Sequence, residues 1–237
     1  MKYLWAFLFL CTSTTLLGGD YAAYGYPSNH SVIVKKHYSV MFDCGTKIPR
    51  WVVYDLSDKD LSFKRKRSGK WKADRSLIAD CMMSDKDYRN NDYDKGHLVP
   101  SADMVRSAEA MQDTFTFANC APQAKEFNRG AWSYLENKVR KWAKSHKYVI
   151  SYTGVGFNNG KPSLRMGKRC VPDYFYKVIF DPKKMEAVAF IGENLPTTIE
   201  TKQVTVSELE KTTGTNLFNT LPVDVQTKIK NKIYRWR

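Results

Sequence analysis

The sequence lacks several features that would indicate a modular, zinc-stabilised or acidic protein. Its 237 residues contain no internal repeat and no convincing linker, so we expect a single domain. None of the five cysteines lies in a C-x-x-C pair, which argues against a structural zinc cluster. Acidic residues are scarce, with 24 Asp and Glu against 38 Lys and Arg. What remains is one domain with an excess of positive charge.

The composition is that of a folded, basic protein. With 43% hydrophobic and 14% aromatic residues the chain can build a core, which excludes an intrinsically disordered protein. The formal net charge of +14 favours polyanions through phosphate contacts and counterion release. Charge alone leaves nucleic acid, acidic polysaccharide and anionic surfaces open as partners.

The N-terminus has the layout of a secretory signal peptide. A basic start, Met1-Lys2, precedes a short apolar run at residues 3–11 and then small or polar residues. The run is too short to span a bilayer. We therefore expect a signal peptide at residues 1–19 and one domain at residues 20–237 of a secreted or periplasmic protein, with no stable membrane insertion once the signal is removed. An uncleaved membrane anchor is the alternative.

Four cysteines remain after removal of the signal peptide, namely Cys44, Cys81, Cys120 and Cys170. An even number in an exported protein predicts two disulfides, and the three pairings that four cysteines allow stay open. Cys120 is interpreted as structural because no thiol-activating histidine pattern adjoins it, with a nucleophilic role as the weaker alternative.

The hydrophobic pattern predicts an α+β fold with a mixed, largely antiparallel sheet core. Expected strands lie at residues 38–43, 51–56, 115–118, 148–152, 174–180 and 185–191. Three helices are expected. A short one starts at Ser107, a longer one covers residues 127–144, and a third opens with a capping box at residues 207–210 and ends near Gly214. The basic tail at residues 228–237 is a further candidate helix.

Two stretches hold the residues suited to chemistry on phosphate. The first contains Asp94, Gly96 and His97, and it holds the one histidine of four that is framed in this way. Histidine titrates near neutral pH and is the usual general base, and glycine permits a close backbone approach beside it. A structural histidine in a loop is the alternative to a general base.

The second stretch contains a helix with two polar residues at its apolar stripe, Asn128 and Glu136. They lie about 12 Å apart along the axis, too far to share a metal ion directly. Glu136 could lean back toward the helix N-terminus and hold a water at a metal. Hydrogen bonds from both residues to neighbouring loops are the alternative interpretation.

A basic loop precedes the histidine stretch. Lysines and arginines gather around Trp71 in this loop, at positions 64–67, 70 and 72. Contact with phosphate and a merely solvated surface are the two interpretations.

These stretches together resemble the DNA/RNA non-specific endonucleases, the family that includes endonuclease G within the ββα-metal superfamily. Residues 94–103 resemble the signature D-R-G-H-L-x-P-x-x-D, and a second block follows at the expected spacing as N-x-x-P-Q from Asn119 and N-x-G-x-W-x-x-x-E from Asn128. The resemblance extends from about Tyr38 to about Leu221, which is nearly the whole mature chain.

The resemblance implies a ββα-metal motif at the active site and a role for each matching residue. His97 is similar to the general base, and Asn128 to the single protein ligand of a divalent metal. Asn119 matches an asparagine that helps to position the site, and Glu136 matches the residue that holds metal-bound water. Oxygen ligands and retained waters favour Mg²⁺, with Mn²⁺ as the alternative.

Two positions depart from the family pattern or are ambiguous. Lys95 stands where the signature has arginine, which keeps the charge at the substrate but not the planar fork. We expect Arg67 to be the catalytic cation of the basic loop, acting at the phosphate. Arg65 and Lys70 are the alternatives for this role; if Arg67 has it, they are expected to bind substrate.

The implied activity is metal-dependent hydrolysis of DNA and RNA with little sequence preference, leaving 5′-phosphate ends. A catalytically inactive binder of nucleic acid or polysaccharide on the same fold is the alternative. A toxin-like effector that meets a dedicated protein inhibitor is a third interpretation. The oligomeric state, the biological role and the preference between DNA and RNA stay open.

Overall fold

The structure is a computed structural model that describes residues 19–28, 31–88 and 92–236. Residues 1–18 of the expected signal peptide lie outside the described residues, so that peptide stays a prediction. In the part that is described, none of the helices is both long enough and apolar enough to cross a membrane.

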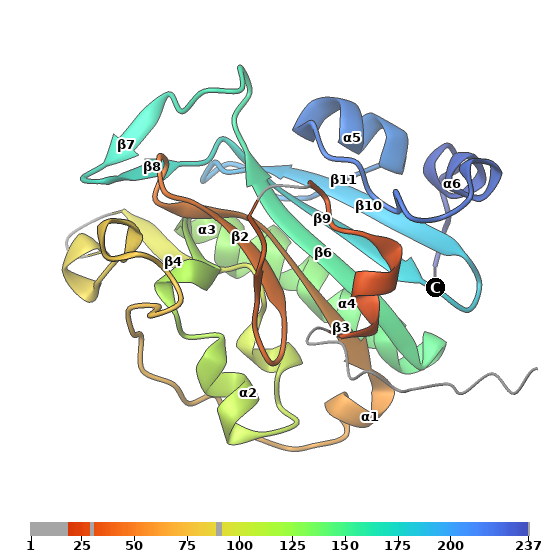
Figure 1. Cartoon of the computed structure of the whole chain (residues 1–237), viewed down its shortest axis with the longest axis horizontal. Helices are drawn as coiled ribbons and strands as arrows, with labels where there is room; N and C mark the ends of the chain where they lie inside the picture. The colour runs from red at the N-terminus through yellow and green to blue at the C-terminus, as the bar shows by residue number, and fades with distance from the viewer. Residues whose placement is uncertain (1–18, 29–30, 89–91, 237) are drawn as a thin grey trace, which may run out of the picture.

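A seven-stranded antiparallel sheet forms the centre of the molecule (Figure 1). Its strand order is β1-β2-β3-β6-β9-β10-β11, and each neighbouring pair is antiparallel. The strands are β1 (Ile33–Val34), β2 (Ser39–Asp43), β3 (Ile48–Ser57), β6 (Tyr148–Gly156), β9 (Tyr174–Asp181), β10 (Glu186–Glu193) and β11 (Lys202–Val204). The predicted α+β fold with a largely antiparallel sheet is confirmed.

Both faces of this sheet are buried. Because side chains alternate along each strand, neighbouring residues enter different core clusters. In β3, Val52 and Tyr54 point into one core cluster, whereas Trp51 and Val53 point into the other. The first face packs against α4 (Ser133–His146), and the second packs against two later helices, α5 (Val206–Thr213) and α6 (Val223–Lys230). The helix α4 thus packs on the central sheet and also belongs to the outer layer that carries the site.

The outer layer is a ββα unit. The strands β4 (Tyr93–His97) and β5 (Cys120–Ala124) form an antiparallel ribbon, which leads through α3 (Lys125–Phe127) into α4. The remaining short elements are α1 (Asp58–Leu61), α2 (Ala108–Asp113), the β7 (Leu164–Met166) and β8 (Arg169–Val171) hairpin, and 3-10 turns at Asp20–Tyr24, Ala79–Cys81, Asp85–Tyr88, Ser101–Asp103 and Phe117–Asn119. The topology therefore supplies the strand–strand–helix arrangement that the motif implies.

The predicted helix over residues 127–144 is interrupted. A π-helical turn, Asn128–Trp132, separates α3 from α4, and Gly130 has non-helical angles there (φ −99°, ψ −105°). Glycine accepts such angles at low cost because it has no Cβ. The interruption changes the direction from which Asn128 is presented, and α4 itself runs two residues further than expected, to His146.

Three other predicted elements differ from the structure. The strand at residues 115–118 is wrong: Thr116 makes one isolated bridge to Lys72, and a 3-10 turn follows. The capping box involves Thr205 and Glu208, two residues before the expected pair, because Glu210 instead accepts from the backbone of Leu217. The C-terminal tail is helical only in α6, which ends at Lys230.

Only one of the two predicted disulfides is present among the described cysteines. Cys44 pairs with Cys81, whereas Cys120 and Cys170 are free and buried. The prediction of a second disulfide is wrong because Cys120 packs with Phe117 in a small cluster, whereas Cys170 packs in the main core. Burial raises the pKa of the Cys120 thiol to about 12, which agrees with a structural rather than a nucleophilic cysteine.

The disulfide gives the first testable prediction. Alkylation of the unreduced, denatured protein from Asp20 onward will label Cys120 and Cys170 but neither Cys44 nor Cys81, as mapped by mass spectrometry. Replacing Cys44 and Cys81 by serine opens a loop closed over 37 residues and will lower the free energy of unfolding by about 4 kcal/mol. Reductant should destabilise the parent but not this variant, and protection of all four thiols would contradict the pairing.

Candidate active site

His97 ends β4, directly opposite Cys120 of β5. Its ring lies 4.6 Å from the ring of Trp71 and 4.9 Å from that of Phe115, centroid to centroid. The preceding Gly96 is required by the close packing of the ribbon, since a Cβ there would lie 2.6 Å from the Cβ of Gln123. The sequence expectation of a close backbone approach beside His97 is therefore confirmed.

The environment keeps His97 uncharged. Burial lowers the pKa of His97 to about 3, and the charge of Arg67 lowers it further in the same direction. Its Nε2 is buried and has no hydrogen-bond partner among the described residues. A neutral imidazole with an unoccupied nitrogen is the form that can take a proton from water.

Asn119 is fully buried and fixes the chain that follows His97. Its Oδ1 accepts from the backbone N–H of Val99 (2.9 Å), and its Nδ2 donates to the carbonyls of Val99 (3.0 Å) and Thr114 (2.9 Å). The Asn119 amide is therefore committed to the backbone of the segments that flank it.

Asn128 is held by the first residue of the histidine stretch. Its Nδ2 donates to Oδ2 of Asp94 (2.9 Å), and no described residue hydrogen-bonds to its Oδ1. Arg129 donates to both oxygens of Asp94, at 2.9 and 2.8 Å. Burial opposes ionisation of Asp94, but the hydrogen bonds from Arg129 and Asn128 outweigh it and lower the pKa of Asp94. The carboxylate thereby orients the amide so that its oxygen is the atom left for a cation.

Glu136 lies eight residues after Asn128 on the same helical segment and is half-buried. Burial is the largest influence on this carboxyl and raises the pKa of Glu136 to about 7, with Asp103 acting in the same direction. The charges of Lys177, Arg140 and Arg67 oppose that rise. Glu136 is therefore a carboxyl whose charge depends on its neighbours.

The basic loop directs one arginine at the site. The Arg67 guanidinium lies 5.5 Å from the ring centroid of Phe115, and its charge acts on both His97 and Glu136. Arg65 instead donates from Nε to the carbonyl of Val105 (3.3 Å). At Lys70 the backbone is held by the Gln112 side chain, at 3.1 and 2.9 Å. Arg67 is thus the loop cation whose charge reaches the general-base candidate.

Lys95 lies beside the same aromatic group. Its Nζ pairs with Asp85 and is 5.5 Å from the ring centroid of Trp71. An open pocket of about 410 Å³ joins the loop to the ββα unit and is lined by Arg67, Trp71, Asp94, Lys95, Asn128 and Arg129. Trp71, Asp94 and Arg129 were not predicted as site residues, although Asp94 opens the motif and Trp71 lies at the centre of the basic loop.

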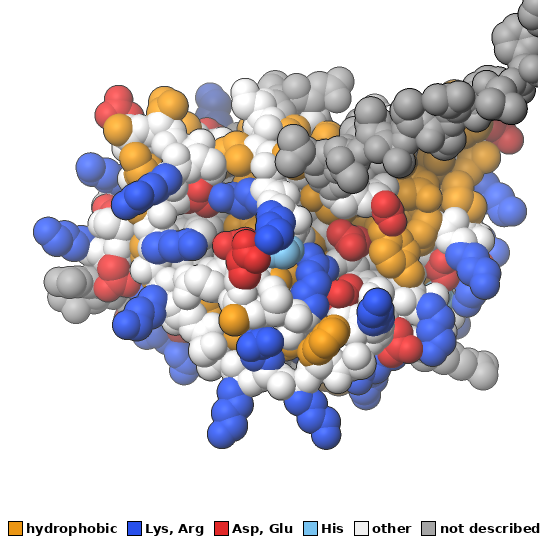
Figure 2. Space-filling view, turned by 60° about the horizontal axis from the view of Figure 1, so that its bottom comes forward, with side chains coloured by type: hydrophobic (Ala, Val, Ile, Leu, Met, Phe, Trp, Pro, Cys, Tyr) orange, Lys and Arg blue, Asp and Glu red, His pale blue; other side chains and the backbone are white. Residues whose placement is uncertain are grey.

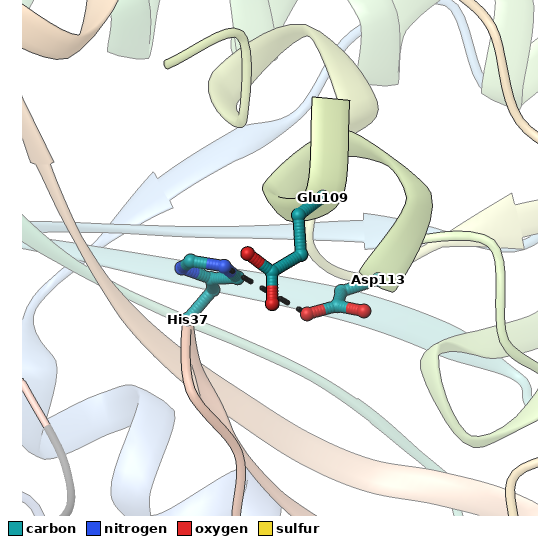
Figure 3. A group of neighbouring side chains, drawn as sticks. All are labelled: His37, Glu109 and Asp113. Atoms are coloured by element: carbon teal, nitrogen blue, oxygen red, sulfur yellow. Dashed lines mark ion pairs between the residues drawn. The ribbon is translucent and has the colours of Figure 1, made fainter. Parts of the chain in front are cut away.

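Away from the pocket, a group of three side chains in the described part of the chain has the spacing of metal ligands: His37, Glu109 and Asp113 (Figure 3). A guanidinium only donates, so the contact of Arg106 with Nδ1 of His37 (3.2 Å) places the ring proton on Nε2, the nitrogen that faces Asp113. Glu109 pairs with Lys36 at 2.8 Å. A protonated nitrogen and a neutralised carboxylate fit an ion-pair cluster better than a metal site.

Positive charge is not confined to the pocket. Lys and Arg side chains are spread over the face shown in Figure 2, with acidic side chains among them, some of which gather near the centre of the view. A distributed excess of this kind attracts a polyanion to the whole molecule, whereas the pocket residues give the contact its geometry.

Comparison with known proteins gives a consistent family assignment. The model of the family described as DNA/RNA non-specific endonuclease matches residues 17–224. The chain is 30% identical over 238 residues to a nuclease of Serratia marcescens, an alignment that covers 93% of this chain and 88% of that protein. It is 32% identical over 172 residues to the mitochondrial endonuclease G of Homo sapiens, covering 68% of this chain and 58% of the human protein.

The fold is also similar to that in a crystal structure of an EndoG/EndoGI complex. The TM-score is 0.77 at 24% identity, over 90% of this chain and 94% of that one. The relatives include both bacterial and mitochondrial nucleases. With the family match spanning most of the chain and the motif residues gathered on one ββα unit, this chain belongs to the DNA/RNA non-specific endonucleases, a family of metal-dependent enzymes that hydrolyse phosphodiester bonds of nucleic acids.

Proposed function

We propose that this protein is a secreted or periplasmic endonuclease that cuts DNA and RNA with little sequence preference and leaves 5′-phosphate ends. The observation that carries the proposal is that one ββα unit holds both a neutral, half-buried His97 and an Asn128 amide whose oxygen is left free by Asp94. The first would supply a proton acceptor, and the second would supply an oxygen ligand for a cation.

The donor set at Asn128 suits a hard divalent cation. Its single amide oxygen leaves most coordination positions to water and phosphate, which matches the preference of Mg²⁺, with Mn²⁺ as the alternative. When bound, such an ion offsets the negative charge that develops on the phosphate and on the leaving oxygen. Glu136, as a carboxylate, would hold and orient a water on the same side of the helix.

His97 would then remove a proton from the attacking water. A pKa of about 3 makes the free imidazole a weak base, but an anionic phosphate next to it favours the protonated form and raises that pKa. In-line attack on phosphorus with departure of the 3′ oxygen gives 5′-phosphate and 3′-hydroxyl ends.

Arg67 would contact the phosphate from the loop side, and Lys95 would contact it from the ribbon side. Both are cations of the pocket wall, and phosphate contacts of this kind carry no base sequence. Because no step uses a ribose 2′-hydroxyl, RNA and DNA are both substrates. Binding that rests on the backbone is weakened by salt.

A catalytically inactive nucleic-acid binder is the second candidate. It is favoured by one observation, the pairing of Lys95 with Asp85 at the position where the family signature has arginine. A dedicated protein inhibitor is a further proposal, since the related fold of EndoG is seen in complex with EndoGI.

The first test is digestion of plasmid DNA and of RNA by the protein from Asp20 onward. We expect degradation of both substrates with Mg²⁺ and none with chelator, because the phosphate charge is then left without its cation. His97→Ala will lower the rate about 10²–10⁴-fold while nucleic-acid binding stays close to that of the parent.

The metal arm of this test has its own variant. Asn128→Ala will raise the Mg²⁺ concentration needed for half-maximal rate. Asn137→Ala, which removes an asparagine from α4, is the matched control and should leave this concentration unchanged. A folded, metal-supplied protein that binds but never cuts would establish the inactive binder. An unchanged metal titration in Asn128→Ala would remove Asn128 as the ligand.

The loop cations give a second prediction about the rate. Arg67→Ala will lower kcat about 10²–10³-fold, because it removes charge from the position next to His97. Arg65→Ala and Lys70→Ala, which remove the same charge from the same loop, will change kcat less than about threefold. Steady-state kinetics at one ionic strength makes the comparison, and equal losses in all three variants would contradict the assignment.

The low pKa of His97 predicts a titration that can be read without activity. In the folded, substrate-free protein the His97 ring will stay neutral from pH 8 down to pH 5, about two units above its pKa of about 3. The unfolded chain takes up this proton near pH 6.5, so the stability contributed by neutral His97 will be lost as the pH falls from about 6.5 toward 3. Ring resonances assigned with His97→Ala report the charge, and a midpoint near 6.5 in the folded protein would contradict the lowered pKa of His97.

A further inference from the structure

A lysine is buried in the middle of the central sheet, behind the active-site helix. Lys177 of β9 has no exposed surface, and its Nζ donates to Oγ1 of Thr153 at 2.5 Å. Thr153 is its cross-strand partner in β6, so the sheet register fixes the position of the ammonium. A buried ammonium held only by a neutral hydroxyl is costly, and it requires a counter-charge nearby.

The charged groups around Lys177 leave one carboxylate for that purpose. Asp103 and Glu136 are the two acids that act on Lys177. Asp103 is already engaged, because it accepts from Arg140 at 2.8 Å and from the Tyr54 hydroxyl at 2.6 Å. Glu136 has no such direct partner among the described residues, so it is the carboxylate available to balance Lys177.

The helix geometry brings the two groups together. The Lys177 Nζ lies 5.2 Å from the ring centroid of Trp132, and Trp132 precedes Glu136 by four residues. Residues four apart on a helix are neighbours on one face, and a helical side chain leans toward the N-terminus. The Glu136 carboxyl therefore leans toward the turn beneath which the Lys177 ammonium lies.

The electrostatics agree with this geometry. Burial lowers the pKa of Lys177 to about 8, and Glu136 is the largest influence that opposes this fall. Lys177 is likewise the largest influence that opposes the rise in the pKa of Glu136 caused by burial. Each group favours the charged form of the other, while Asp103, Arg140, Arg67 and Tyr54 complete the set of charged and titratable groups around the pair.

We propose that Lys177 is a positioning residue of the nuclease: from inside the sheet it keeps Glu136 an oriented carboxylate behind the helical turn that carries Asn128. The proposal rests on the role proposed above for Glu136. Without the ammonium, burial would leave the Glu136 carboxyl protonated at neutral pH, and a protonated carboxyl would hold the water at the site less well.

The test replaces Lys177 by methionine, which keeps the length of the side chain but not its charge. We expect the acidic limb of the kcat profile between about pH 5 and 9 to move upward by about one pH unit or more. At pH 7 kcat should fall about tenfold and approach the parent value again at pH 9, with KM changed less than about threefold. A loss of the same size at every pH would overturn the proposal.

Two matched variants separate this role from a structural one. Lys138 lies in α4, the helix of Glu136, and packs on aromatic rings, but it is not among the main influences on the Glu136 carboxyl. The pH profile of Lys138→Met should therefore match that of the parent. Combining Lys177→Met with Glu136→Gln should cost nothing beyond Glu136→Gln alone. An additional tenfold loss in the double variant would show that Lys177 does not act through Glu136.

A measurement that needs no activity keeps the proposal distinct from the proposed function. The ¹³C resonance of the Glu136 carboxyl, assigned with Glu136→Gln, should titrate at a higher pH in Lys177→Met than in the parent. If the parent cuts no nucleic acid the proposed function fails, yet this shift still tests the pair. If Lys177→Met does not fold, the nearly isosteric Thr153→Val should give a smaller shift in the same direction, and no shift would overturn the proposal.

Discussion

The antiparallel pairing of β4 with β5 is the constraint on which the site depends. It sets His97 opposite Cys120 and brings Asp94 opposite Gln123, a few residues before the π turn. From there Asp94 reaches the amide of Asn128. A slip of one residue in this register would turn His97 to the other face of the ribbon and separate Asp94 from Asn128. The ribbon is therefore the element that converts a linear motif into a pocket.

The candidate site and the sheet behind it also contain groups whose pKa values are shifted from their ordinary values. Burial makes His97 a weaker base, raises the pKa of Glu136 and lowers that of Lys177. Such shifts are sustained because the surrounding sheet and helix are already packed on both faces, so the chain cannot relax to solvate these groups. The rigidity of the central sheet thus has a direct chemical consequence at the active-site helix.

The sequence predicted the antiparallel sheet better than the irregular turns next to the candidate site. His97, Asn128 and Glu136 belong to a local motif with fixed spacing, so the motif alone predicts that one ββα unit carries them. The π turn at Gly130 and the bridge at Thr116 depend on tertiary packing, which strand and helix periodicity does not contain. The prediction of a second disulfide was wrong for a related reason. An even number of cysteines does not show which of them lie close enough to pair. The burial of Lys177 could not be predicted from the sequence. A lysine in an apolar strand is exposed if the strand lies at an edge, and only the sheet order shows that β9 lies between β6 and β10.

Aromatic faces explain how the pocket keeps its cations available. Arg129 is committed to Asp94 through two hydrogen bonds, so its charge is largely neutralised. Arg67 lies over Phe115, and Lys95 lies over Trp71, where the ring quadrupole stabilises a cation without cancelling its charge. The remaining pair of Lys95 with half-exposed Asp85 is of the kind that water and salt weaken. If Lys95 binds substrate as proposed above, a phosphate would replace Asp85 as its partner, and the ammonium would make the contact without the planar fork of the arginine in the family signature.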